Sequence, residues 1–198
     1  MKTKLIFGAL AALLGAATGL LAQPQPGTVL WTYDFEPIGG YGQPASPSPA
    51  LAADGTIYIG TVYGLQALTN TGFAASNKWT FPVPTASGIA VGFDGTIYLA
   101  SASQNFYAVN PDGSQKWAYT FAAAGSSQPA IGRDDTIYVV ADASLYALTA
   151  SGTKKWSHSI ESNGGIPAID SEGTIYVRNN FWATNCYAFS PDGTLKWS

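Results

Sequence analysis

The chain has 198 residues, 46% hydrophobic and 11% charged, and this length is enough to bury one sizeable core. Its 22 glycines, 12 prolines and 11 tyrosines suit many short strands joined by tight turns. The net charge is -3 and no basic run occurs, which argues against nucleic acid or an anionic membrane as the main partner. Cys186 is the single cysteine, so an intrachain disulfide is excluded, and its strand context predicts a buried, inert thiol.

The N-terminal segment, residues 1–22, has the features of a secretory signal peptide. Lys2 and Lys4 form a short positive region, an apolar stretch follows, and a Gln-Pro repeat then interrupts it. We expect cleavage near Ala22 and export, so the mature protein is predicted to be periplasmic or secreted. A retained membrane anchor is the alternative, although the apolar stretch is short for a membrane span.

The rest of the chain is built from a repeat of about 40 residues. Its clearest element is a Thr-Ile-Tyr strand after a turn of acids and glycine, with the four tyrosines at Tyr58, Tyr98, Tyr138 and Tyr176. A short apolar strand precedes this element, and an alanine-bearing strand follows it. Each copy then closes on a tryptophan strand, with Trp79, Trp117, Trp156 and Trp197. Four hairpin-linked strands per copy predict one blade of a β-propeller.

These copies predict an all-β domain over residues 23–198, made of four-stranded antiparallel blades at residues 47–82, 87–121, 127–160 and 165–198. Each blade has two apolar faces, which radial stacking buries. We expect the alanine of the third strand to keep its position thin, so that tryptophans and tyrosines of neighbouring blades fill the space. Burying one such aromatic side chain contributes roughly 2–3 kcal/mol.

The two ends of the repeat region indicate further blades. Residues 28–35 include Trp31 and are predicted to form an outer strand that closes the last blade of a ring. The final copy ends directly after Trp197, whereas the earlier copies continue their tryptophan strands. We therefore expect a fragment of a larger, seven- or eight-bladed ring. A four-bladed ring with one spare tryptophan strand is the alternative.

Two of the turns carry a resemblance to a known family. Residues 107–117 read Tyr-Ala-Val-Asn-Pro-Asp-Gly-Ser-Gln-Lys-Trp, and residues 187–197 read Tyr-Ala-Phe-Ser-Pro-Asp-Gly-Thr-Leu-Lys-Trp. Both resemble the tryptophan-docking repeat of PQQ-like (quinoprotein-type) β-propellers, and the resemblance covers about residues 28–198. It implies the fold but not one function, because the family mixes PQQ-dependent dehydrogenases, the lipoprotein of outer-membrane β-barrel assembly and secreted repeat proteins of no known activity.

The residues offer little catalytic chemistry. The dehydrogenases of the family imply PQQ, calcium and, in many, adjacent cysteines, whereas this chain has one cysteine. Its turn acids are spread one per blade, and we interpret them as turn formers: Asp54, Asp94, Asp135 and Glu172. One carboxylate per turn cannot supply the about six to eight oxygens of a calcium site. His158, the single histidine, is predicted in an outer strand without a nucleophile elbow nearby. We therefore predict no catalytic residue, no cofactor and no metal site.

Segments that are longer in one copy than in the others are the candidate contact sites. One precedes the first blade at residues 37–46 and contains Tyr41. The other, at residues 178–185, contains Arg178, Asn180, Phe181 and Trp182. The strand order of the family puts both on the same side, and exposed aromatic, Arg and Asn side chains suit a sugar or peptide. The alternative for Trp182 is that it simply caps the blade edge.

The sequence thus predicts a secreted, non-catalytic β-propeller that serves as a scaffold or interaction module for a protein or glycan. Nucleic acid is not an expected partner, and no membrane attachment is expected after signal cleavage. One alternative is an enzyme, either a PQQ-type oxidoreductase or a polysaccharide-active propeller, whose site lies in missing blades. The other is an outer-membrane assembly factor, although no cysteine follows the apolar segment to carry a lipid.

Overall fold

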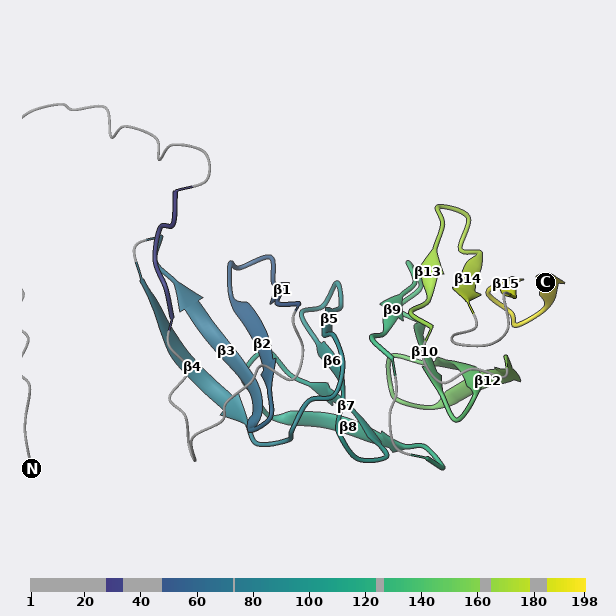
Figure 1. Ribbon diagram of the computed structural model, residues 1–198, viewed down its shortest axis with the longest axis horizontal. Helices are drawn as coiled ribbons and strands as arrows, with labels where there is room; N and C mark the ends of the chain where they lie inside the picture. The colour runs from purple at the N-terminus through teal and green to yellow at the C-terminus, as the bar shows by residue number, and fades with distance from the viewer. Residues whose placement is uncertain (1–27, 34–47, 73, 124–126, 161–164, 179–184) are drawn as a thin grey trace, which may run out of the picture. The chain divides into compact units, whose positions relative to one another are not determined.

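The computed structural model describes residues 28–33, 48–72, 74–123, 127–160, 165–178 and 185–198. Within these ranges all regular secondary structure is β, and the strands form four antiparallel sheets of four strands each (Figure 1). Every strand lies within residues 31–198, which form one compact unit. The predicted signal peptide lies outside the described residues.

The described part of the chain contains no helix of the length and apolarity that a membrane span requires.

Each sheet is one predicted blade, and its strands lie side by side in chain order. Blade 1 contains β1 (Ala50–Leu51), β2 (Ile57–Thr61), β3 (Gly64–Asn70) and β4 (Ala75–Phe81). Blade 2 contains β5 (Ala90–Val91), β6 (Ile97–Ala100), β7 (Asn105–Val109) and β8 (Gln115–Thr120). Blade 3 contains β9 (Ala130–Ile131), β10 (Ile137–Ala141), β11 (Ser144–Leu148) and β12 (Lys154–Ser159). Blade 4 contains β13 (Ala168–Ile169), β14 (Ile175–Arg178), β15 (Cys186–Phe189) and β16 (Leu195–Trp197). The predicted fold class is confirmed.

An aspartate holds the first turn of each blade. In blade 1 the carboxylate of Asp54 accepts hydrogen bonds from the amide and the hydroxyl of Thr56, both at 2.9 Å. This is the local bond that makes Asp a turn former. Gly55 follows the aspartate with φ +82°, a left-handed conformation that glycine adopts without strain.

The prediction named the wrong turn acid in blades 3 and 4. In blade 3 Asp134 accepts the amide and hydroxyl of Thr136, and Asp135 occupies the left-handed position with φ +59°. In blade 4 the carboxylate of Asp170 accepts the amides of Glu172 and Thr174. In blade 3 the backbone decides, because Asp135 takes the left-handed position and leaves Asp134 to accept the bonds. In blade 4 the reason is reach, because the short Asp side chain closes a turn with the amides ahead of it, whereas Glu is one methylene longer.

A row of Tyr, Ala and Trp crosses one side of every blade, which we call the tryptophan face. In blade 1 Tyr58 pairs with Ala67, and Ala67 pairs with Trp79. The small alanine lets the two flanking rings meet across it, with ring centroids 5.7, 5.9, 5.8 and 6.0 Å apart in blades 1 to 4. The rings that meet across the alanine come from the same blade, whereas the prediction took them from neighbouring blades. The neighbouring blade adds aliphatic side chains and one tyrosine at each junction: Tyr107, Tyr146 and Tyr187.

Those aliphatic side chains lie on the opposite side of each blade, which we call the receiving face. Ile97 and Leu99 of blade 2 are fully buried against the tryptophan face of blade 1. Ile137 and Val139 repeat this contact between blades 2 and 3, and Ile175 and Val177 repeat it between blades 3 and 4. Three interfaces of one kind therefore form the core.

The tryptophan also reaches the last turn of the following blade. Its indole Nε1 donates to a backbone carbonyl there, over 3.0, 2.8 and 3.0 Å, from Trp79 to Pro111, Trp117 to Ala150 and Trp156 to Pro191. The ring covers the glycine of that turn so closely that an added Cβ would lie 2.8, 2.7 or 2.9 Å from it, at Gly113, Gly152 and Gly193. Real Cβ atoms essentially never come this close, so glycine is required by the docking itself.

Residues 28–33 form no strand, and residues 34 and 35 lie outside the described residues. Each described sheet already has its own fourth strand, so the closing of a further blade by residues 28–35 stays a prediction. The prediction for the cysteine of the last blade is wrong. Cys186 is exposed rather than buried. It occupies the place of Phe106 and Leu145, which are buried because the next blade covers them.

Candidate functional site

Most of the predicted contact residues lie outside the described residues: Tyr41, Asn180, Phe181 and Trp182. Their role stays a prediction. Arg178 is described, is exposed and ends β14, where it pairs with Cys186. This is the end of the blade opposite to its first turn, so Arg178 is separated from the clefts described next.

Clefts occur on the other side of the blades, along what we call the turn edge. The first and last turns of each blade share this edge, because the four strands alternate in direction. A cleft of about 250 Å³ lies between blades 3 and 4, and one of about 290 Å³ lies between blades 1 and 2. Equivalent positions of the repeat line both, so the clefts are a product of how the blades stack.

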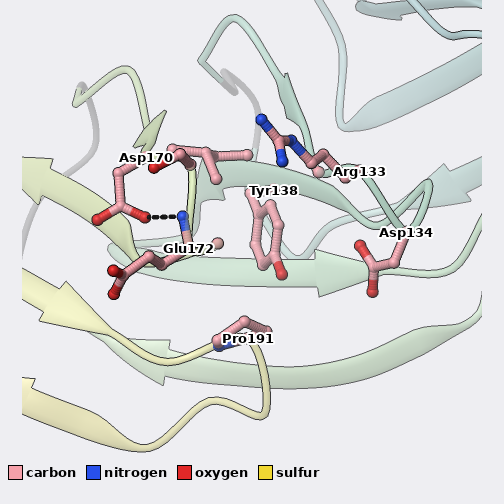
Figure 2. A pocket seen from close by; sticks show the side chains of 10 residues that line it. Arg133, Asp134, Tyr138, Asp170, Glu172 and Pro191 are labelled. Carbon is pink, nitrogen blue, oxygen red and sulfur yellow. Dashed lines mark hydrogen bonds between the residues drawn. The ribbon is translucent and has the colours of Figure 1, made fainter.

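The cleft between blades 3 and 4 combines a packed apolar wall with a charged rim (Figure 2). Tyr138 of β10 stands between the turns that form the rim, and it is only 1% exposed. Arg133 and Asp134 come from the first turn of blade 3, and Glu172 comes from the first turn of blade 4. Pro191 closes the cleft from the β15–β16 turn. Such a site can bind a group that is partly apolar and partly charged.

The cleft between blades 1 and 2 has fewer charged side chains in its lining. Ala52, Ala53 and Pro111 line it together with Phe93. Phe93 is 78% exposed, more than any other large hydrophobic side chain among the described residues. An exposed phenylalanine at the tip of a turn contributes little to the core, and its ring is accessible to another molecule.

The residue two positions before the left-handed residue of each first turn varies in chemistry, and we call it the tip position. It is Ala53, Phe93, Arg133 and Ser171 in blades 1 to 4. We did not single out this position from the sequence. Aligning the four copies on their Thr-Ile-Tyr strands would have revealed it, since its side chain is small, aromatic, basic and hydroxylated in turn.

In blades 1 to 3 the carboxylate of the turn acid forms an ion pair with the lysine that precedes the tryptophan of the same blade. The pairing of β7 with β8 shifts register so that Lys116 is an extra, bulged residue, and a bulge re-aims its side chain. Its Nζ lies 2.9 Å from the carboxylate of Asp94 and 2.9 Å from the hydroxyl of Thr96. Lys78 and Lys155 make the same contacts in blades 1 and 3.

The electrostatics of Asp94 reflect these bonds. Burial raises the pKa of its carboxyl, but hydrogen bonds from Thr96 and Lys116 and the charge of Lys116 outweigh this effect and hold the pKa at about 2. The pKa of Asp134 is also below its ordinary value, because bonds from Thr136 and Lys155 again outweigh burial. Both groups are anions that stabilise turns at neutral pH, and neither is poised to move a proton.

These residues do not fit a calcium-bound quinone cofactor. The turn carboxylates are one per blade and already bonded to threonine and lysine, and among the described residues no three His, Cys, Asp or Glu side chains gather. His158 lies on the outer strand β12, as predicted; it is exposed and stacks on Phe189 with centroids 5.2 Å apart. Its ring therefore packs at a blade junction.

Comparison with known proteins identifies the repeat. A family model described as "Outer membrane protein assembly factor BamB" matches residues 20–198. Solved structures share the fold: a virginiamycin B lyase from Staphylococcus aureus bound to quinupristin (16% identity, TM-score 0.64), BamB from Moraxella catarrhalis (16%, 0.58) and a protein of unknown function from Bacteroides caccae (13%, 0.59). They align with 83%, 76% and 82% of this chain, which spans 57%, 46% and 62% of theirs. No curated protein matches the sequence.

Proposed function

Since the chain belongs to the PQQ-like β-propeller family described as outer membrane protein assembly factor BamB, we propose that it is an exported, non-catalytic interaction module that binds a protein or glycan along its turn edge. The observation that carries this proposal is the variable tip position, where a rigid and repeated turn presents Phe93 and Arg133 on neighbouring blades. Aromatic and arginine side chains are enriched in protein interfaces, which favours a protein over a glycan.

The commitment of the turn acids supports a binding role over a catalytic one. Asp54, Asp94 and Asp134 each bond to a threonine and a lysine of their own blade. A general acid or base needs a carboxyl whose pKa lies near the working pH, and the pKa of Asp94 is instead about 2. In this proposal the turn acids hold the turns in their conformation, and the tip residues of the turns contact the partner.

Binding arrays test the proposal. The full chain would be labelled and applied to peptide and glycan arrays, together with Phe93→Ala, Arg133→Ala and the control Ser159→Ala, an exposed position at the far end of the outer strand β12. We expect the first two to weaken binding at least about tenfold and the control to bind like wild type. Unchanged binding by a Phe93→Ala/Arg133→Ala double variant would contradict the proposal. A loss with Trp182→Ala instead would move the site to the loop at residues 178–185.

Export is tested separately. Expression with the native N-terminus should yield a secreted or periplasmic protein that begins near Gln23. Recovery of the chain with its first 22 residues intact, in the membrane fraction, would support a retained anchor instead.

An outer-membrane assembly role is the second candidate, and the description of the matching family favours it. It predicts that the chain restores outer-membrane protein levels in a strain that lacks its own BamB. If the chain is exported normally but does not restore these levels, the assembly role is excluded and the general interaction module remains. The oxidoreductase and polysaccharide-active alternatives stay predictions that no described residue favours.

A further inference from the structure

The cleft between blades 3 and 4 carries two opposite charges that the fold itself does not use. Arg133 at the tip of the blade 3 turn and Glu172 of the blade 4 turn are both exposed, and they flank Tyr138 (Figure 2). Among the described residues, ion pairs form only between the turn aspartates and lysines of blades 1 to 3. The charges of Arg133 and Glu172 are therefore both available to a ligand.

Glu172 is unpaired because a second acid holds its turn. It occupies the position of the turn aspartates of blades 1 to 3, two residues before the turn threonine. In blade 4 the carboxylate of Asp170 instead accepts the amides of Glu172 and Thr174, both at 2.9 Å, and the hydroxyl of Tyr176 at 3.0 Å. The lysine of this blade, Lys196, donates to the hydroxyl of Thr174 at 3.1 Å. The turn is thus complete without the carboxylate of Glu172.

The two remaining acids of the cleft do not cancel this arrangement. Asp134 lies beside Arg133 in the chain, but its carboxylate pairs with Lys155 at 3.3 Å. Asp170 belongs to the same turn as Glu172 and adds negative charge on that side. The rim therefore has a basic pole on blade 3, at Arg133, and an acidic pole on blade 4, at Glu172.

An apolar surface lies between the two poles. Tyr138, Ile169 and Pro191 line it, and Tyr138 is held by the core with 1% exposure. The cleft of about 250 Å³ is smaller than the about 300–1,000 Å³ of typical small-molecule sites. It suits one side chain of a larger ligand better than a whole small molecule.

We propose that this cleft binds a peptide segment of a partner protein in which one apolar side chain stands between an acidic and a basic residue. The apolar side chain packs on Tyr138, the acidic residue pairs with Arg133, and the basic residue pairs with Glu172. Complementary charges of this kind fix which segment binds and in which direction. The inference rests on the proposed function, because it specifies the protein segment that the turn edge recognises.

Short fluorescent peptides test the pattern by anisotropy. Each has a central Leu with Asp on one side and Lys on the other, in both orders and at several spacings. Matched peptides replace the Leu, the Asp or the Lys with Ser. For the best peptide we expect the Ser in place of Leu to weaken binding at least about tenfold, and the Ser in place of either charge to weaken it about two- to fivefold.

Charge reversal in the protein identifies the two poles. Arg133→Glu should come to prefer peptides with Lys on both sides, and Glu172→Arg should come to prefer peptides with Asp on both sides. The double variant should again prefer one Asp and one Lys, in the order opposite to that of the wild type. Lys154→Glu is the matched control, since it makes the same charge change as Arg133→Glu at an exposed position outside the cleft, and it should keep the wild-type preference.

Circular dichroism checks that the variants fold. Arg133→Gln and Glu172→Gln replace any reversal that does not fold, and they should remove the preference for Asp and for Lys, respectively.

Three results would overturn the inference: no binding of any peptide of the set, equal binding of charged and Ser-substituted peptides by the wild type, or a charge preference that the reversals leave unchanged. The proposed function fails by a different result, when the Phe93→Ala/Arg133→Ala double variant binds its array ligands like wild type. Loss of array binding in that double variant, together with any of the three results, would overturn the charge pattern alone.

Discussion

Replacing the glycine beneath a docked tryptophan should destabilise the protein far more than replacing a glycine of the same conformation elsewhere. Gly152 has φ +83°, and its added Cβ would lie 2.7 Å from Cδ2 and 2.9 Å from Cε3 of Trp117. Gly55 has φ +82°, and its added Cβ would meet nothing within 4 Å. Both Gly→Ala changes carry the left-handed strain of about 1–2 kcal/mol, but only Gly152→Ala also displaces a ring.

The displacement of the Trp117 ring determines how much more stability Gly152→Ala should lose than Gly55→Ala. Overpacking a close contact costs about 1–3 kcal/mol, and the shift also weakens the 2.8 Å bond from the indole of Trp117 to Ala150. We expect Gly152→Ala to lower the free energy of unfolding by about 3–5 kcal/mol and Gly55→Ala by about 1–2 kcal/mol. Urea titration followed by circular dichroism measures both, with equal m values as the check on comparability.

A double-mutant comparison isolates the contact. In a Trp117→Ala background the ring is gone, so adding Gly152→Ala should cost no more than Gly55→Ala does in the wild type. Equal losses for Gly152→Ala and Gly55→Ala in the wild type would refute the reasoning, because the docking contact would then carry no steric demand.

Three further predictions concern the turns. The pKa of Asp94 is about 2 in the folded protein against 3.8 ordinarily, so the stability that its carboxylate contributes is present above pH 3.8 and is lost as the pH falls towards 2. After discounting for the solvent exposure of Asp94, this contribution is about 1 kcal/mol. In urea titrations Asp94→Asn should therefore lose less stability than wild type between pH 6 and pH 2. Asp135→Gly should raise the melting temperature slightly, by a stabilisation of about 0.5–1 kcal/mol, since glycine suits φ +59° and fills this place in the other three blades; a lower melting temperature would contradict the assignment of the turn. Asp142→Ala should cost about 1–2 kcal/mol by calorimetry, because the carboxylate accepts the amides of Ala122 and Ala123, whereas Asp142→Asn keeps one acceptor oxygen and should lose less.

The fold could be predicted from the sequence because the same pattern of strands and turns occurs in four copies. Turn acids, Thr-Ile-Tyr strands and tryptophans recur in phase, and four hairpin-linked strands per copy of about 40 residues are typical of a propeller blade. Cross-strand register was harder to predict. The bulge at Lys116 places Trp117 opposite Ala108, and a count of residues along the strand does not reveal such a shift.

The turn acids and the candidate site could not be predicted from the sequence of a single repeat. Asp134 and Asp135 are adjacent and chemically equal, and only the backbone shows which one takes the left-handed position. The exposure of Cys186 depends on whether another blade covers it, which its own strand does not encode. The tip position of Phe93 and Arg133 becomes visible only when the copies are compared, because each turn alone is an ordinary polar turn.

Hydrogen exchange of the tryptophan indoles tests the central claim most directly. The structure has the indoles of Trp79, Trp117 and Trp156 bonded to carbonyls of the following blades. Nuclear magnetic resonance of ¹⁵N-labelled chain, with each indole assigned by single Trp→Phe variants, should show slow exchange at these three. Exchange at the rate of free indole for all three would mean that the blades are not joined by their tryptophans.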